Sequence, residues 1–238
     1  MTTPLQKVAI ITGASQGMGA GLVAAYRKHG YAVVANSRTI GQSDDPNVVS
    51  VAGDIADPAT GTHLVATAID RFARVDTLIN NAGVFVGKAF TDYTAQDYEF
   101  VTGVDLRGFF NVTQPTVAQM LAQGEGGHIV NITLVLAEYA DVNVPCALES
   151  LAKGGLAAVT KSLAIEYAAH GIRVNAVSPG TIRTPIFPAE AYEAFARLQP
   201  LGRVGEVDDV VRGVLYLEDA PLVTGEFLHV DGGRSAGH

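Results

Sequence analysis

Short apolar runs alternate with longer amphipathic stretches along the whole chain. The amphipathic stretches have a helical period and cover about 58–73, 94–123, 147–169 and 206–218, and a further helix extends to about His29. The apolar runs have strand length and cover 7–12, 31–37, 47–53, 75–81, 127–133, 172–178 and 226–232. This alternation predicts one α/β domain over residues 1–238, with a doubly wound parallel sheet of about seven strands.

The least regular segment is 184–205, which has prolines near both ends and room for only a short helix between them. Ordered insertions of this length usually serve a binding site, and ligands of open α/β sheets lie beyond the carboxyl ends of the strands. We therefore expect this segment to be a lid over the cleft of a small-molecule substrate.

Composition narrows the class of partner. A hydrophobic content of 48% fits strands buried on both faces, and the formal net charge of −8 argues against nucleic acid or an anionic membrane. Cys146 is the sole cysteine and the six histidines have no metal-ligand spacing, so we expect neither an internal disulfide nor a metal site. The N-terminal residues resemble neither a signal peptide nor a membrane span, which favours a cytoplasmic protein.

A glycine-rich loop, TGASQGMG at 12–19, directly follows the first strand and opens the first helix. Gly13 permits a tight turn, while Gly17 and Gly19 allow a phosphate to approach the helix N-terminus closely. An ordinary strand–helix loop is the alternative, but the position in the first turn of the chain favours a Rossmann-type dinucleotide site. Ser15, Gln16 and Met18 complete the loop that would bind the cofactor.

The end of the second strand bears on which dinucleotide is bound. A carboxylate there would bond the ribose 2′-hydroxyl of NAD, whereas an arginine accommodates the 2′-phosphate of NADP. The strand ends with Ser37 followed by Arg38, and a guanidinium suits a phosphate through paired hydrogen bonds. The sequence therefore favours NADP over NAD, with a solvated loop charge as the alternative role of Arg38.

With these motifs, further segments resemble the short-chain dehydrogenase/reductase family over essentially the whole chain. They are GDIAD (53–57), NNAG (80–83), SPGTIRTP (178–185) and TGEFLHVDGG (224–233). The resemblance implies an adenine contacted by Asp54 and Ile55, an adenine ribose flanked by Asn81, Ala82 and Gly83, and a nicotinamide contacted by Pro179, Gly180, Ile182 and Thr184. It also implies a homotetramer or dimer in which the helices at about 104–123 and 147–169 pair across subunits.

The catalytic positions of that family are altered in this chain. Members that reduce carbonyls use an Asn on the fourth helix, a Ser after the fifth strand, and a Tyr and a Lys spaced YxxxK. Aligned on the flanking motifs, Lys153 is retained and would hold the nicotinamide ribose. Glu149 stands where the Tyr belongs, Leu134 where the Ser belongs, and Asp105 where the Asn belongs.

Glu149 is the substitution with the largest chemical consequence. The ordinary pKa of a glutamic acid is ~4.3, and the Lys153 ammonium four residues later lowers it further. Unless Glu149 is strongly desolvated, we therefore expect an ionised carboxylate that accepts a proton but does not donate one. The alternative is a surface Glu–Lys pair worth ~0.3–0.5 kcal/mol. Asp105 either attracts the Lys153 ammonium or is only a carboxylate near the start of a helix.

Three neighbouring residues are weaker candidates. Thr133 needs a local bulge to replace the missing hydroxyl of Leu134, because successive residues in a strand point to opposite faces. We expect Tyr139 to line a pocket or an interface, and Cys146 to be a packing residue.

Three functions are compatible with this pattern. The first is an NADP(H)-dependent oxidoreductase of an alcohol or carbonyl, with Glu149, Lys153 and Asp105 as its catalytic residues. The second is an inactive family member that binds a dinucleotide and acts as a sensor or assembly partner. The third is a lyase or isomerase that uses Glu149 as a base.

Overall fold

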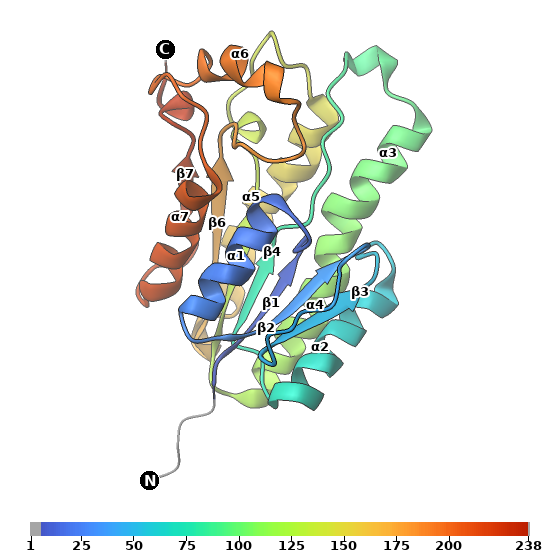
Figure 1. The fold of residues 1–238 in the computed structure, drawn as a ribbon, viewed down its shortest axis with the longest axis vertical. Coiled ribbons are helices and arrows are strands. Elements are labelled where there is room, and N and C mark those ends of the chain that lie inside the picture. The colour runs from blue at the N-terminus through green and yellow to red at the C-terminus, as the bar shows by residue number, and fades with distance from the viewer. Residues whose placement is uncertain (1–5, 238) are drawn as a thin grey trace.

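The computed structural model describes residues 6–237; residues 1–5, where we expect neither signal peptide nor membrane span, and His238 lie outside them. Within the described residues, seven parallel strands form one sheet in the order β3-β2-β1-β4-β5-β6-β7 (Figure 1). The strands are β1 Val8–Thr12, β2 Ala32–Ser37, β3 Val48–Ala52, β4 Thr77–Asn80, β5 Gly127–Ile132, β6 Ile172–Pro179 and β7 Phe227–Val230. The predicted fold class is confirmed, and the strand order reverses at the β1–β4 boundary, where such sheets bind their ligands.

Helices cover both faces of the sheet. Helices α1 (Gly17–Lys28) and α7 (Val207–Asp219) pack on one face, and α2 (Pro58–Phe72), α4 (Phe109–Gln123) and α5 (Ala147–Glu166) pack on the other (Figure 1). None of the helices within residues 6–237 is both long and apolar enough to cross a membrane.

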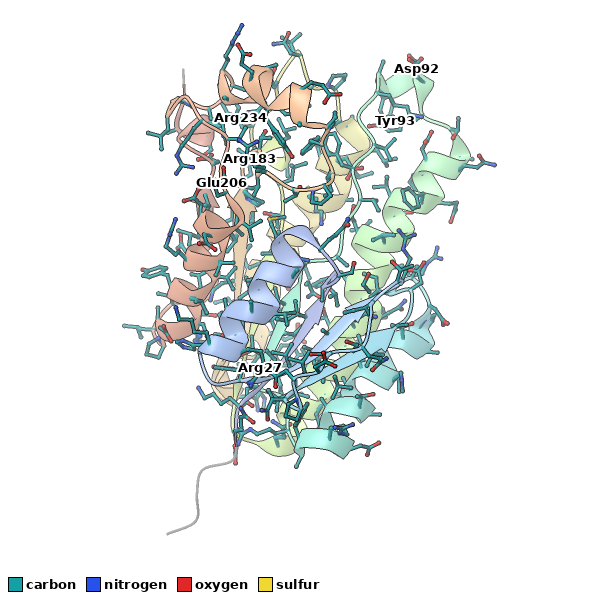
Figure 2. The ribbon with its side chains drawn as sticks, in the orientation of Figure 1. Arg27, Asp92, Tyr93, Arg183, Glu206 and Arg234 are labelled. Carbon is teal, nitrogen blue, oxygen red and sulfur yellow. The ribbon has the colours of Figure 1, made fainter. Side chains whose placement is uncertain are left out.

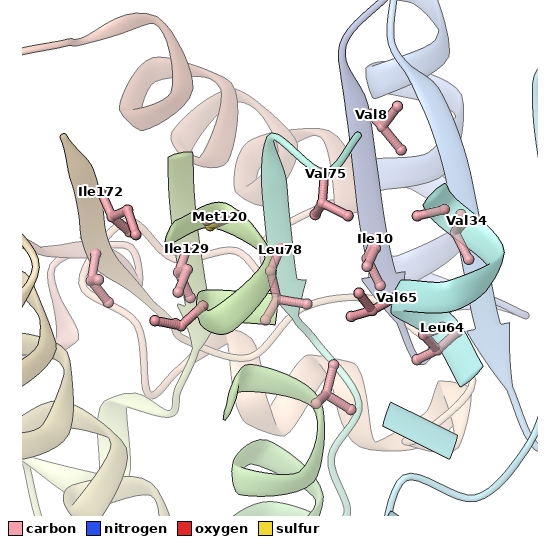
Figure 3. Packing of buried hydrophobic residues seen from close by; sticks show 14 of the residues in the cluster. Val8, Ile10, Val34, Leu64, Val65, Val75, Leu78, Met120, Ile129 and Ile172 are labelled. Carbon is pink, nitrogen blue, oxygen red and sulfur yellow. The ribbon is translucent and has the colours of Figure 1, made fainter. Parts of the chain in front are cut away.

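Alternate residues of each strand supply the two cores. Val8 and Ile10 of β1 pack toward α2 and α4, whereas Ala9 and Ile11 pack toward α1 and α7. Figure 3 shows the first of these cores, in which Leu64 of α2 and Met120 of α4 lie over the strands. Burial on both faces explains why the strands are apolar at almost every position.

The helical pattern over 94–123 is not one regular helix, contrary to expectation. Helix α3 (Ala95–Thr102) begins at a capping box made by Thr94 and Asp97, and it runs into a π-helical segment, Gly103–Gly108, before α4 begins. Such wide turns are common at functional sites. A Cβ at Gly108 would lie 2.5 Å from Ile55 Cδ1, so a glycine allows this segment to approach the loop between β3 and α2 closely.

The predicted lid, 184–205, lies beyond the carboxyl end of β6 (Figure 1). It contains a 3₁₀ turn, Ala189–Ala191, and the short helix α6, Tyr192–Ala196. The Tyr192 hydroxyl donates to Thr184 O at 2.7 Å and accepts from Thr184 N at 3.1 Å, which closes the segment on itself. Its role as a lid stays a prediction.

Two ion pairs join the loop before α5 to the C-terminal segment. Arg234 lies 2.6 Å from Asp141 Oδ2, and His229 lies 2.8 Å from Glu138 Oε1. Arg234, labelled in Figure 2, is only 2% exposed. The extended loop that precedes Glu149 is therefore held by the end of the chain.

Candidate cofactor cleft and active site

The residues predicted to bind the dinucleotide line one cleft at the carboxyl ends of β1, β2 and β4. Its volume is about 260 Å³. The predicted residues that line it are Gly13, Ser15, Gln16, Gly17, Met18, Gly19, Ser37, Arg38, Asp54, Ile55, Asn81, Ala82, Gly83 and Thr184. Sequence reasoning missed Asn36, Thr39, Gly53, Val84, Val104, Pro185 and Ile186, most of which adjoin a motif residue.

The loop between β1 and α1 requires its glycines. Gly13 and Gly17 have φ of +65° and +54°, in the left-handed region that side chains disfavour. A Cβ at Gly19 would lie 2.1 Å from the Gly13 carbonyl oxygen, a contact that backbone atoms cannot tolerate. The start of α1 therefore stays open to a ligand, as a phosphate-binding loop must.

Asn81 leaves an acceptor in the cleft without a partner. Its side-chain amide donates to Thr12 O at 2.9 Å and to Gly13 O at 3.2 Å, which fixes its orientation. Its Oδ1 is buried and has no hydrogen-bond partner among the described residues. A buried orphan acceptor in a cleft fits a ligand hydroxyl, such as a ribose supplies, so the residues present suit a dinucleotide.

The outer end of the cleft carries one cationic side chain. Arg38 is exposed at the end of β2, beside Ser37, whose hydroxyl lies 3.0 Å from that of Ser15. The carboxylate of Asp54 also lines the cleft, but its Oδ1 accepts from Ala56 N at 2.9 Å. A guanidinium and two hydroxyls are donors suited to a phosphate.

A second, inner cavity of about 110 Å³ adjoins this cleft and shares lining residues with it. We call it the inner cavity. Its walls include all the positions assigned to the nicotinamide, Pro179, Gly180, Ile182 and Thr184, together with Lys153 and Glu149. The structure thus brings the predicted nicotinamide contacts and two of the three catalytic candidates together.

Lys153 is paired with Asp105. Its Nζ lies 3.0 Å from Asp105 Oδ1 and donates to Ile132 O at 3.3 Å. A Cβ at Gly83 would lie 3.0 Å from both Asp105 Oδ1 and Lys153 Nζ, so the glycine leaves room for the pair. Asp105 therefore attracts the ammonium, and the simpler expectation of a surface pair between Glu149 and Lys153 is wrong.

Glu149 is fully buried, so the strong desolvation that would keep it from being fully ionised is present. Burial and the neighbouring Asp105 raise the pKa of Glu149 to about 7, although Val86 N–H and Lys153 oppose the shift. Its Oε1 accepts a hydrogen bond from Val86 N at 2.8 Å. The Lys153 ammonium still lowers the pKa of Glu149, but burial and Asp105 outweigh it.

The Asp105 carboxylate is near enough to Glu149 for its negative charge to raise the pKa of Glu149. Glu149 Oε2 and both oxygens of Asp105 are buried and receive no hydrogen bond from any donor of the described residues. Two neighbouring carboxylates disfavour each other's ionised form, and burial acts on Glu149 in the same direction. Near neutral pH Glu149 is consequently partly protonated at the wall of the inner cavity.

The remaining candidates do not supply the missing hydroxyl. Leu134 lines the inner cavity, and the Thr133 hydroxyl beside it donates to Val177 O at 3.1 Å. Tyr139 packs with Cys146 in a small cluster beneath the loop, and neither lines the inner cavity. Cys146 is buried, as expected of a packing residue, and burial raises the pKa of its thiol.

The order of strands, the glycine loop at the reversal of strand order and the two adjoining cavities define a Rossmann-type α/β protein. A family model described as enoyl-(acyl carrier protein) reductase matches residues 13–235. The L-rhamnose 1-dehydrogenase (NAD(P)(+)) of a Sphingomonas species is 34% identical over 251 residues, with 95% of each chain covered. The chain belongs to the short-chain dehydrogenase/reductase family.

Solved structures of similar proteins have the same fold. ElxO with NADP bound has a TM-score of 0.91 and 25% identity, over 98% of this chain and 100% of that one. A 3-ketoacyl-(acyl-carrier-protein) reductase from Brucella melitensis, complexed with NADH, has a TM-score of 0.87 and 32% identity, over 96% of this chain and 98% of that one.

Proposed function

We propose that the protein is an NADP(H)-dependent oxidoreductase of an alcohol or carbonyl, with Glu149 as its general acid and base. The observation that carries the proposal is the buried carboxyl group of Glu149, which lines the inner cavity together with Lys153 and the expected nicotinamide contacts; its burial raises its pKa to about 7. A catalytic acid works best when its pKa lies near the operating pH. The ordinary pKa of a phenol is about 10, so Glu149 is the better matched of the two groups at neutral pH.

Three observations support NADP as the cofactor. The cleft is lined by Arg38 and two serines at the end of β2. The orphan Asn81 Oδ1 fits a ribose hydroxyl, and a structural neighbour has NADP bound. Because another neighbour is complexed with NADH, the preference for NADP rests on Arg38.

Each polar residue at the inner cavity has its own role in the proposed reaction. When bound there, the nicotinamide supplies hydride transfer. Lys153, held by Asp105, would bind its ribose. Glu149 would donate a proton to the carbonyl oxygen during reduction and would accept it back during alcohol oxidation. Asp105 keeps Glu149 partly protonated, and burial excludes water from the reacting groups.

A second candidate is a family member that binds the dinucleotide without turnover. The observation that favours it is Leu134, which offers no hydrogen bond to a substrate oxygen where the family uses a serine. The bond from Val86 N to Glu149 then has a purely structural role, because it ties the chain after β4 to α5.

One experiment separates the two. NADPH and NADH are titrated by fluorescence, and alcohol and carbonyl panels are screened for absorbance change with wild type, Glu149→Gln and Glu149→Tyr. Glu166→Gln is the matched control, since Glu166 is an exposed acid on the same helix. Turnover that is lost in Glu149→Gln but kept in Glu166→Gln supports the enzyme. Turnover in Glu149→Tyr alone shows that Glu149 is not the acid.

We also propose that the protein is a cytoplasmic homotetramer. Phe110 of α4 and Ile165 of α5 expose 57% and 78% of their surfaces, which supports pairing of these helices between subunits. Light scattering behind size-exclusion chromatography, with wild type and Ile165→Lys, tests the assembly.

A further inference from the structure

The part of the inner cavity left for a substrate is small and apolar. Its volume of about 110 Å³ includes the space beside Pro179, Gly180, Ile182 and Thr184, where the proposed nicotinamide would lie. The opposite walls come from three segments: the chain after β4, the end of β5 and the lid. They present Phe85, Leu134, Ile186 and Phe187.

No cationic group is available there to bind an anion. Among the described residues that line the inner cavity, Glu149 and Lys153 carry the titratable side chains, and Lys153 is already paired with Asp105. Arg183, the cation directly before the lid, lies over the Tyr192 ring at 4.5 Å from its centroid. Its Nε donates to Glu206 Oε1 at 3.1 Å, and both residues are labelled in Figure 2. A carboxylate or phosphate in this cavity would therefore be buried without a counter-charge, which is strongly unfavourable.

The wall opposite the expected nicotinamide contacts offers few hydrogen-bond partners to a substrate with several hydroxyl groups. The Thr133 hydroxyl donates to Val177 O, and the Asn81 amide donates to the chain around Thr12. Leu134 removes the hydroxyl expected at its position. Each buried hydroxyl of a polyol that stays unbonded costs about 1–3 kcal/mol.

An aromatic wall connects the lid to the chain after β4. The rings of Phe85 and Phe187 pack edge to face, with their centroids 6.0 Å apart. The rings of Phe187 and Phe195 pack in the same way, with their centroids 5.0 Å apart. Phe85 directly precedes Val86, whose N–H bonds Glu149. The wall that would contact a substrate ring is thus anchored to the proposed acid.

We infer that the substrate is a small, uncharged ketone or secondary alcohol whose carbon atom adjoins a single apolar ring. The inference rests on the proposed function, because it assumes that the nicotinamide occupies its side of the inner cavity. Sugars, carboxylated ketones and phosphate-bearing thioesters are disfavoured as substrates, because the wall opposite the nicotinamide is apolar and no unpaired cation of the described residues lines the cavity.

Binding to the protein–NADP⁺ complex tests the inference without turnover, because a ketone cannot react with the oxidised cofactor. Calorimetry compares acetophenone with fructose, and 4-nitroacetophenone with 4-acetylbenzoate, which has the same shape and a negative charge. We expect acetophenone to bind, and fructose and 4-acetylbenzoate to bind at least about tenfold more weakly than their uncharged apolar counterparts. Binding of neither ketone, or equal binding within either pair, overturns the inference.

Variants confirm the location. Phe187→Ala should weaken acetophenone binding about tenfold or more, whereas Leu222→Ala, at a residue 97% exposed, should leave it unchanged. Equal binding by both variants places the ketone elsewhere and overturns the inference. The proposed function and the substrate class can fail separately. Selective binding of acetophenone without its reduction by NADPH would contradict catalysis alone. Faster turnover of fructose or 4-acetylbenzoate than of the matched ketone would contradict the substrate class alone.

Discussion

Lys153 Nζ lies 3.0 Å from Asp105 Oδ1, although the acid nearest to Lys153 on its own helix is Glu149. The π-helical segment Gly103–Gly108 carries Asp105 to this position. Burial and the Asp105 carboxylate raise the pKa of Glu149, and together they outweigh the Lys153 ammonium, which lowers it.

The pH dependence of reduction should report this arrangement. Glu149 must be protonated to act as an acid, so reductive kcat/KM should fall as the pH rises through about 7, the pKa of Glu149. Asp105→Asn removes the neighbouring negative charge, so the pKa of Glu149 should fall. The descending limb of the pH profile of kcat/KM should therefore move to lower pH. At pH 8 the variant should be at least about tenfold slower than wild type. An unshifted limb would show that Asp105 does not act through Glu149.

The control for that change is Asp70→Asn. Asp70 is an exposed acid on α2, away from the cleft-lining residues. Its pH profile should coincide with that of the wild type.

Arg38 should decide between the two dinucleotides. Arg38→Gln removes the guanidinium that would bind the 2′-phosphate, and a charge-assisted bond of about 1.5–3 kcal/mol corresponds to a loss of about 10- to 100-fold in NADPH affinity. NADH affinity should change little. Fluorescence titration measures both, with Arg71→Gln, an exposed arginine of α2, as the control. Equal weakening of NADPH and NADH would contradict a role at the 2′-phosphate.

Gly19→Ala should damage the phosphate loop. The new Cβ would lie 2.1 Å from the Gly13 carbonyl oxygen, so the loop must move or the protein loses about 1–3 kcal/mol of stability. Either way, dinucleotide affinity should fall by more than about tenfold. Gly41→Ala is the control, because nothing lies within 4 Å of a Cβ there. Urea unfolding and cofactor titration of both variants measure the effect, and an unchanged Gly19→Ala would refute the geometry of the loop.

A buried polar network joins α7 to the opposite end of the sheet. Glu218 accepts hydrogen bonds from Tyr26 at 2.8 Å, from Tyr31 at 2.9 Å and from His128 Nδ1 at 2.8 Å. The Asn175 amide donates to His128 Nε2 at 3.1 Å, which indicates a neutral ring. Burial alone would raise the pKa of Glu218, but these donors lower it to about 2.

This network predicts how the free energy of unfolding depends on pH. Because the pKa of Glu218 lies at about 2 in the folded protein and 4.5 ordinarily, its contribution is complete above pH 4.5 and is lost as the pH falls toward 2. Glu218→Gln should remove about 2–3 kcal/mol at pH 7 and flatten the acid decline of the free energy of unfolding. Urea unfolding from pH 7 to 3 measures it. Glu226→Gln, at an exposed acid, should behave like wild type; an equally steep decline in Glu218→Gln would contradict the assignment.

The sheet and the cofactor cleft could be predicted from the sequence because the residue patterns that specify them are local. The first four residues of β1 are apolar because both faces of the strand are covered, and Gly13 and Gly17 of TGASQGMG are favoured by their own positive φ. The π-helical segment at Gly103–Gly108, by contrast, could not be predicted from the sequence. Two glycines flank it, but the widened turn depends on packing against Ile55.

The state of Glu149 could not be read from sequence because its cause is tertiary. Lys153 is adjacent on the helix, whereas Asp105 and the Val86 N–H come from other segments. The partner of His128 was equally hidden, since Glu218 lies 90 residues away. Distant acids become neighbours only in the folded chain, so charge states are the least predictable property of such a site.

The ion pair of Arg234 and Asp141 limits how segments can be exchanged among relatives. A chimera that receives only the loop 134–145 of another family member would keep a buried arginine and lose its counter-charge. The loop and the last residues of the chain should therefore be transplanted together. Attempts to redesign the substrate range by loop grafting should count them as one exchangeable module.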